Sequence, residues 1–132
     1  DVVLRPLGKQ EITKKDIEIA RTAWRYFEKN YNPETGMVNG GNHYPQATVE
    51  DIALTIFATI SADKLGLIEK PTFKKRINSL LSTLLRIKLY NNELPNIVYN
   101  TQNGNMVDFA NRYSEKGIGW NIYHIARLLK AL

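Results

Sequence analysis

The sequence contains no cysteine among its 132 residues, which excludes disulfide bonds, thiolate metal sites and a cysteine nucleophile. Polar residues interrupt every apolar stretch, so no run is long enough to cross a membrane. The only histidines are His43 and His124, and no HExxH spacing is present, which leaves little for a metal ion to bind. We therefore predict no membrane insertion, no metal site and no cofactor.

Three further signals are missing from the chain. It has neither a nucleophile elbow nor a glycine-rich loop that could cradle a phosphate. No signal peptide is visible, and the first residue is Asp1 rather than Met, which suggests a processed protein or a piece of a longer one.

What is present indicates a globular domain. The length suits one domain with its own core, and the hydrophobic fraction of 43% argues against disorder. Eighteen Lys and Arg against thirteen Asp and Glu give a net charge of +5, which raises the question of nucleic-acid binding. The basic residues alternate with apolar positions along two predicted helices, however, as on the solvated faces of amphipathic helices. We favour that interpretation over phosphate binding and predict no nucleic-acid partner.

Apolar periodicity predicts a mainly helical fold. Residues 1–10 have no period and are expected to form an extended lead-in. Capping signatures beginning at Thr13 and Thr48 mark the starts of the first two helices. Gly66 suits the end of the second helix, and Pro71 suits the first turn of the third. The four predicted helices cover about residues 14–30, 52–65, 71–89 and 120 onwards.

Two long irregular segments separate these helices. The first, residues 31–47, is rich in Gly, Asn and Pro, and loops of this length are often functional. The second contains Asn103-Gly104, a dipeptide suited to the turn of a hairpin. A short β-hairpin formed by residues 97–101 and 105–109 is therefore predicted before the last helix.

The order of long and short connections predicts where a site would lie. A short turn at Gly66 makes the neighbouring helices antiparallel, so both long loops should meet at one end, together with the starts of the second and fourth helices. The residues expected at that end are Asp51, Asp108, His43, Tyr44, Tyr99, Asn100, Trp120 and His124.

Aromatic rings beside carboxylates and amides are what a sugar-binding cleft needs, because a pyranose face stacks on a ring while its hydroxyls require donors and acceptors. Asp51 and Asp108 are the acid and base candidates for glycoside hydrolysis. Each has an alternative role, Asp51 as a helix-capping acid and Asp108 as a turn residue. Trp120 and His124 could equally belong to the core.

Several segments together resemble a known bacterial family. They are the segments AWRYF at 23–27, TGMV at 35–38, TVEDIA at 48–53, LPN at 94–96, YNT at 99–101, MVD at 106–108, GIGW at 117–120 and ARLL at 126–129. This pattern, spread over about residues 14–132, is similar to domain of unknown function 3131, a family with a glucoamylase-like architecture. The resemblance implies an (α/α) toroid of helical hairpins whose cleft lies where the inner helices begin.

The chain departs from the family pattern at two positions. Glu50 stands where members usually have an aromatic residue, and His124 stands where the last helix usually has an acid. Four helices also make only a partial ring, so we expect either a missing remainder of the toroid or a homo-oligomer that covers the exposed inner helices.

The leading hypothesis is a glycoside-hydrolase-like domain that binds, and could hydrolyse, a bacterial glucan or related polysaccharide. Trp120 and Tyr99 would stack on the sugar, while Asn100 and Arg127 would bind its hydroxyls, with His43, Tyr44 and His124 lining the same site. Such a partner implies an extracytoplasmic location, exported or periplasmic. The alternative is a non-catalytic helical module that binds a protein or a sugar. Carboxylate geometry discriminates between these hypotheses.

Overall fold

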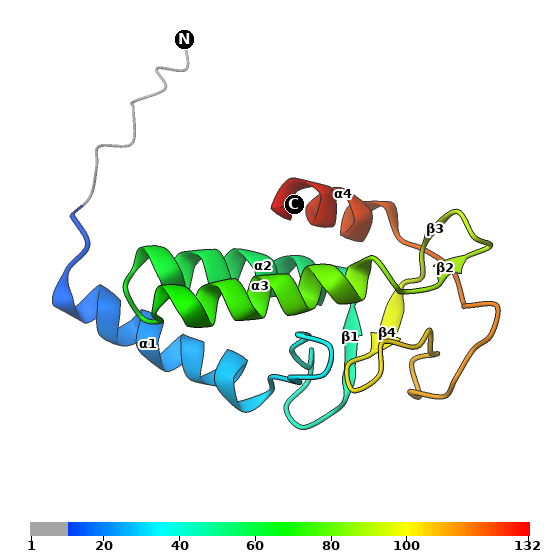
Figure 1. The fold of residues 1–132 in the computed structure, drawn as a ribbon, viewed down its shortest axis with the longest axis horizontal. Coiled ribbons are helices and arrows are strands. Elements are labelled where there is room, and N and C mark those ends of the chain that lie inside the picture. The colour runs from blue at the N-terminus through cyan, green and yellow to red at the C-terminus, as the bar shows by residue number, and fades with distance from the viewer. Residues whose placement is uncertain (1–10) are drawn as a thin grey trace, which may run out of the picture.

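The structure, a computed structural model, describes residues 11–132 (Figure 1). The lead-in expected at residues 1–10 lies outside the described part of the chain. In order, the elements are α1 (Lys14–Lys29), β1 (Gln46–Thr48), α2 (Val49–Lys64), α3 (Lys70–Leu84), β2 (Leu89–Tyr90), β3 (Leu94–Pro95), β4 (Val98–Asn100) and α4 (Ile122–Ala131). The predicted fold class is confirmed, because the protein is mainly helical with short antiparallel strands before the last helix.

Capping residues start α1 and α2 where the sequence predicts them. The Thr13 hydroxyl accepts a hydrogen bond from the Asp16 N–H, and the Asp16 carboxylate accepts one from the Thr13 N–H. Thr48 and Asp51 repeat this reciprocal arrangement at α2. At the other end of α2, Gly66 adopts a φ of +69°, and the Leu67 N–H donates to the carbonyl of Ala62. This is the Schellman geometry that only a residue tolerant of positive φ closes without strain.

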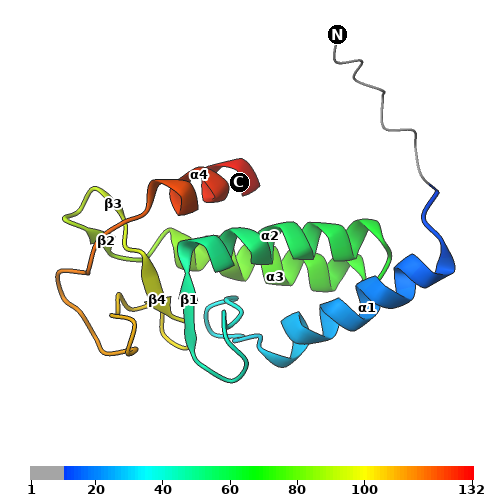
Figure 2. The same cartoon turned by 180° about the vertical axis from the view of Figure 1, so that it is seen from behind.

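Helix α2 forms the centre of the molecule. It packs most extensively on α4 and also contacts α3 and α1. Figure 1 shows α2 and α3 side by side, with α1 on one side of the pair and α4 on the other, and the view from behind in Figure 2 agrees. The core beside α2 includes Ile52, Ala53, Ile56, Leu80 and Leu128, all of which are buried. Helix α2 is therefore surrounded on several sides.

Helix α3 ends earlier than predicted, at Leu84 rather than near Leu89. Leu89 and Tyr90 instead form β2, which pairs with β3 across a turn. Asn91 and Asn92 in that turn have φ values of +50° and +61°, the left-handed conformation that Asn tolerates better than most residues.

The strand pairing near Asn103-Gly104 also differs from the prediction. Strand β4 lies within the predicted residues 97–101, but its partner is β1, with Ala47 opposite Tyr99. The segment 105–109 faces β4 through an isolated bridge between Met106 and Tyr99 and a hydrogen bond from the Asn100 N–H to the Asn105 carbonyl, and Val107 forms a second isolated bridge with Tyr113. Gly104 has the expected positive φ of +77°. Tyr99 thus has Ala47 of β1 as one bridge partner and Met106 as another, so β1 lies on one edge of β4 and the residues after the turn lie on the other.

Both long loops lie at one end of the helices, as the alternation of connections predicts (Figure 1). The side-chain amide of Gln46 in the first loop donates to the carbonyl of Asp108 in the second, at 2.7 Å. The starts of α2 and α4 lie at this end too. Within residues 11–132, none of the helices combines the length and hydrophobicity needed to span a bilayer.

Candidate functional site

Asn96 connects the second long loop to the start of α4. It is completely buried, and its Nδ2 donates to the carbonyl of Val98 at 2.7 Å and to that of Val107 at 3.3 Å. Its Oδ1 accepts from the N–H groups of Ile118, at 2.8 Å, and Gly119, at 3.3 Å. The Asn96 side chain thereby connects β4, the segment at Val107 and the backbone that leads into α4. These contacts fix where α4 begins.

The Asp51 carboxylate is occupied by the start of its own helix. Its Oδ2 accepts hydrogen bonds of 2.8 Å from both the N–H and the hydroxyl of Thr48. Gly40 packs so closely that a Cβ there would lie 2.4 Å from this oxygen. Burial, and then the nearby charge of Asp51, raises the pKa of the Tyr26 hydroxyl. The structure thus gives Asp51 the capping role that the sequence left open beside a catalytic one.

Asp108 is likewise occupied by local donors. Oδ1 accepts from the N–H groups of Ala110 and Arg112, and Oδ2 accepts from the Arg112 Nε at 2.9 Å. The Arg112 N–H is the main reason that the pKa of Asp108 lies below its ordinary value, and the Arg112 guanidinium and the Ala110 N–H lower it further. This carboxyl group is therefore stabilised in its ionised form.

Tyr99 and Asn100 both form hydrogen bonds within the protein. Tyr99 is fully buried, so it offers no surface for stacking, and burial raises the pKa of its hydroxyl to about 12. That hydroxyl donates to the carbonyl of Lys88 and accepts from the N–H of Asn96. The Asn100 Oδ1 accepts from the N–H groups of Gln102 and Asn103, and so shapes the turn that follows β4.

Three other predicted residues are exposed at the loop end. Trp120 is 47% exposed and Tyr44 is 43% exposed, so neither belongs to the core. The Tyr44 hydroxyl donates to the carbonyl of Phe109 and ties the two loops together. His43 is exposed with a φ of +58°, and its N–H donates to Asn30.

His124 and Arg127 meet on α4, where they both face Glu50 from α2. The Glu50 Oε1 lies 3.0 Å from the Arg127 Nε, and its Oε2 lies 3.4 Å from the His124 Nε2. A surface groove surrounds this trio. Its lining residues are Glu50, Asn121, Tyr123, His124, Ala126, Arg127 and Lys130. We call it the α2–α4 groove.

The groove runs along α4, from its N-cap to Lys130 in its last turn, beside the first turn of α2. Glu50 is in the first turn of α2, and Asn121 is the N-cap of α4, where its Oδ1 accepts from the N–H groups of Tyr123 and His124. The Tyr123 side chain is 77% exposed beside the groove. The arrangement presents a carboxylate, a guanidinium and an imidazole next to an accessible aromatic ring.

The family model described as "Protein of unknown function (DUF3131)" matches residues 18–132. The chain belongs to this family. No curated protein and no solved structure matches it. Membership confirms the family that the sequence motifs resemble, and the family description assigns no activity.

In this DUF3131 domain, Glu50 and His124 are neighbours in space, with the Glu50 Oε2 lying 3.4 Å from the His124 Nε2. His124 is among the site residues predicted from the sequence, whereas Glu50 is not. No local sequence pattern shows that α4 brings His124 and Arg127 to Glu50, because this contact depends on how α4 packs against α2.

The described residues offer no metal centre. Between residues 11 and 132, no three or more His, Cys, Asp or Glu side chains are grouped so that they could hold an ion. The α2–α4 groove itself presents hydrogen-bonding, ionic and aromatic side chains.

Proposed function

We propose that this domain binds a neutral glycan in the α2–α4 groove. The observation that carries the proposal is the Glu50, His124 and Arg127 cluster beside the exposed ring of Tyr123. Fixed planar groups of both hydrogen-bonding types suit sugar hydroxyls, which donate and accept. An exposed aromatic ring suits the apolar face of a pyranose.

Contacts within the groove position its polar side chains before a ligand binds. The Glu50 carboxylate sets the Arg127 guanidinium in place through the 3.0 Å contact, which leaves further guanidinium donors for a ligand. Asn121 caps α4 and so fixes the helix that carries both His124 and Arg127. Groups that are already ordered lose less conformational entropy on binding than flexible ones do.

The state of the two acidic candidates favours binding over hydrolysis. A general acid needs a carboxyl group whose pKa is raised, whereas the pKa of Asp108 is lowered. Asp51 accepts its hydrogen bonds from Thr48 within its own helix cap. We therefore assign a binding role to the domain and structural roles to these two carboxylates.

The glucoamylase-like toroid remains part of this proposal. In a toroid with α2 and α4 as inner helices, these two helices would pack together and a cleft would lie beside the start of α2. The α2–α4 packing and the place of Glu50 in the groove support this arrangement. A polysaccharide partner of this kind would place the domain outside the cytoplasm.

A binding experiment with neutral oligosaccharides tests the proposal. NMR titration of the ¹⁵N-labelled chain with β-linked and α-linked glucose oligomers should shift the amide signals of Asn121 to Arg127. Replacing Tyr123 with alanine should weaken binding by about fivefold, since an aromatic contact contributes about 1 kcal/mol beyond its buried area. Phe109→Ala, which removes another exposed ring outside both the groove and its lining, is the control and should leave the affinity unchanged.

Two outcomes would contradict the assignment. If none of the oligomers shifts the groove signals, the glycan proposal is wrong. If chromatography detects cleaved oligomers, and Asp108→Asn abolishes the cleavage, the domain is an enzyme and the binding-only role is refuted.

A second candidate function is binding of another protein chain by α4. It is supported by the exposed apolar side chains on the surface of this helix. Ile122, Leu129 and Leu132 on this surface are 58%, 69% and 65% exposed. Such a surface would suit the remainder of a toroid or a second copy of the chain. Sedimentation analysis of the wild type and Leu129→Glu tests self-association, because a monomer at all concentrations excludes the second copy.

A further inference from the structure

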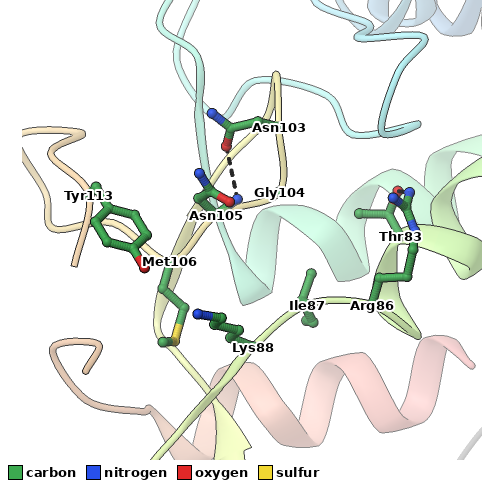
Figure 3. A pocket seen from close by; sticks show the side chains of 9 residues that line it. All are labelled: Thr83, Arg86, Ile87, Lys88, Asn103, Gly104, Asn105, Met106 and Tyr113. Carbon is green, nitrogen blue, oxygen red and sulfur yellow. Dashed lines mark hydrogen bonds between the residues drawn. The ribbon is translucent and has the colours of Figure 1, made fainter. Parts of the chain in front are cut away.

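A second, smaller pocket lies between the end of α3 and the turn that follows β4. Its lining residues are Thr83, Arg86, Ile87, Lys88, Asn103, Gly104, Asn105, Met106 and Tyr113. Figure 3 shows Tyr113 on one side of this pocket, Thr83 and Arg86 on the opposite side, and Lys88 and Met106 between them. We call it the α3–turn pocket. It is separate from the α2–α4 groove and shares no residue with it.

The charge of the α3–turn pocket is of one sign. Arg86 and Lys88 line it, and none of its nine lining residues, all within residues 11–132, is acidic. Within residues 11–132, neither cation forms a salt bridge. The Arg86 Nε and Nη2 donate to Ser82 and Thr83, so that three of the five guanidinium donors remain. Two cations with free donors and no acidic neighbour in the pocket would attract an anionic group.

Neutral polar groups and a ring complete the lining. The Asn103 Oδ1 accepts from the Asn105 N–H at 2.9 Å, a contact visible in Figure 3, and this bond fixes the direction of the Asn103 amide. Its Nδ2 donors are therefore directed away from the turn. Tyr113 is 60% exposed and presents its ring at the side of the pocket. These are groups for hydroxyls and for an apolar ring face.

The framework of the pocket is fixed by buried hydrogen bonds. The Thr83 hydroxyl donates to the carbonyl of Thr35 at 2.7 Å, which anchors the end of α3. The carbonyl of Lys88 accepts from the buried Tyr99 hydroxyl. Gly104 donates its N–H to Asn100 at 2.8 Å, and the Met106 side chain is buried beneath the turn. Both walls are thus held in place before any ligand arrives.

We propose that the α3–turn pocket binds a single carboxylate-bearing sugar unit, a hexuronate. The carboxylate would contact Arg86 and Lys88, the hydroxyls would contact the Asn103 and Asn105 amides, and the ring would pack on Tyr113. The cavity, of about 180 Å³, is smaller than the pockets that hold drug-sized ligands, which fits one sugar residue. The proposal does not depend on the function of the α2–α4 groove.

NMR titration with D-glucuronate, D-glucose and inorganic phosphate tests it. Glucuronate should shift the amide signals of Asn103, Gly104 and Asn105, and added sodium chloride should weaken the effect because it screens the charges. Glucose, which has the same ring without the carboxylate, should bind at least about tenfold more weakly, the value of one charged hydrogen bond. Phosphate, which has the charge without the ring, should also bind more weakly.

Variants assign the contacts. Lys88→Met should weaken glucuronate binding by about tenfold, while Lys75→Met, which removes an equal charge from an exposed position on α3, should not change it. Glucose binding as strongly as glucuronate would overturn the role of the carboxylate. Phosphate binding equally well would overturn the sugar. An equal effect of both lysine variants, or no shift at all, would refute the site. Tyr123→Ala is expected to leave glucuronate binding intact, which separates this result from failure of the groove.

Discussion

Replacing Asn96 with alanine is expected to destabilise the domain strongly. Its two shorter side-chain bonds, 2.7 Å to the Val98 carbonyl and 2.8 Å to the Ile118 N–H, lie in a fully buried position. Leaving a buried partner unsatisfied costs about 2 kcal/mol, so the variant should lose about 4 kcal/mol of unfolding free energy. The longer bonds to Val107 and Gly119 add to this loss.

Urea denaturation followed by far-ultraviolet circular dichroism measures that free energy. Asn78→Ala is the control, because Asn78 is exposed on α3 and alanine slightly favours a helix. Hydrogen exchange should in addition accelerate at Ile118 and Gly119 in Asn96→Ala. A loss below about 1 kcal/mol, the net value of one ordinary hydrogen bond, would refute the idea that Asn96 holds the start of α4.

Three further predictions concern single positions. Gly36→Ala should lower the melting temperature more than Gly66→Ala; both have positive φ, but a Cβ at Gly36 would lie 2.5 Å from the Leu80 nitrogen, whereas nothing lies within 4 Å at Gly66. Thr48→Ala should cost about 1 kcal/mol in urea denaturation through loss of the α2 cap, and Thr48→Ser should restore most of it. The pKa of Asp108 is lowered by folding, so its stabilising contribution is present above the unfolded pKa and is lost as the pH falls through the folded one. Carbon NMR of this carboxyl should give a midpoint below 3.8, and a midpoint at or above that value would contradict the hydrogen bonds from Ala110 and Arg112.

Features determined by neighbouring residues could be predicted from the sequence. The caps at Thr13 and Thr48 depend on a residue three positions away, and Gly66 ends α2 through its own backbone freedom. The meeting of the two long loops followed from the lengths of the connections and is confirmed by the contact between Gln46 and Asp108.

Features that depend on distant contacts could not be predicted in this way. The pairing of β4 with β1 joins two loops that are far apart in the sequence. Tyrosine is a residue type that can stack on a sugar ring, but tertiary packing buries Tyr99 completely. The position of Glu50 opposite His124 depends on how α4 packs against α2, which no local pattern encodes.

The pairing of β1 with β4 has a consequence for the order of folding. Strand β1 leads directly into α2, so this two-stranded pairing positions one side of the α2–α4 groove, while Asn96 positions the other. Pairing β1 with β4 closes the long stretch of chain between these two strands into a loop. This closure costs entropy that the local α2–α3 hairpin does not have to overcome. We expect the helices to form early and the groove to assemble last. Partial opening of the native state should then release the groove while α2 and α3 stay folded.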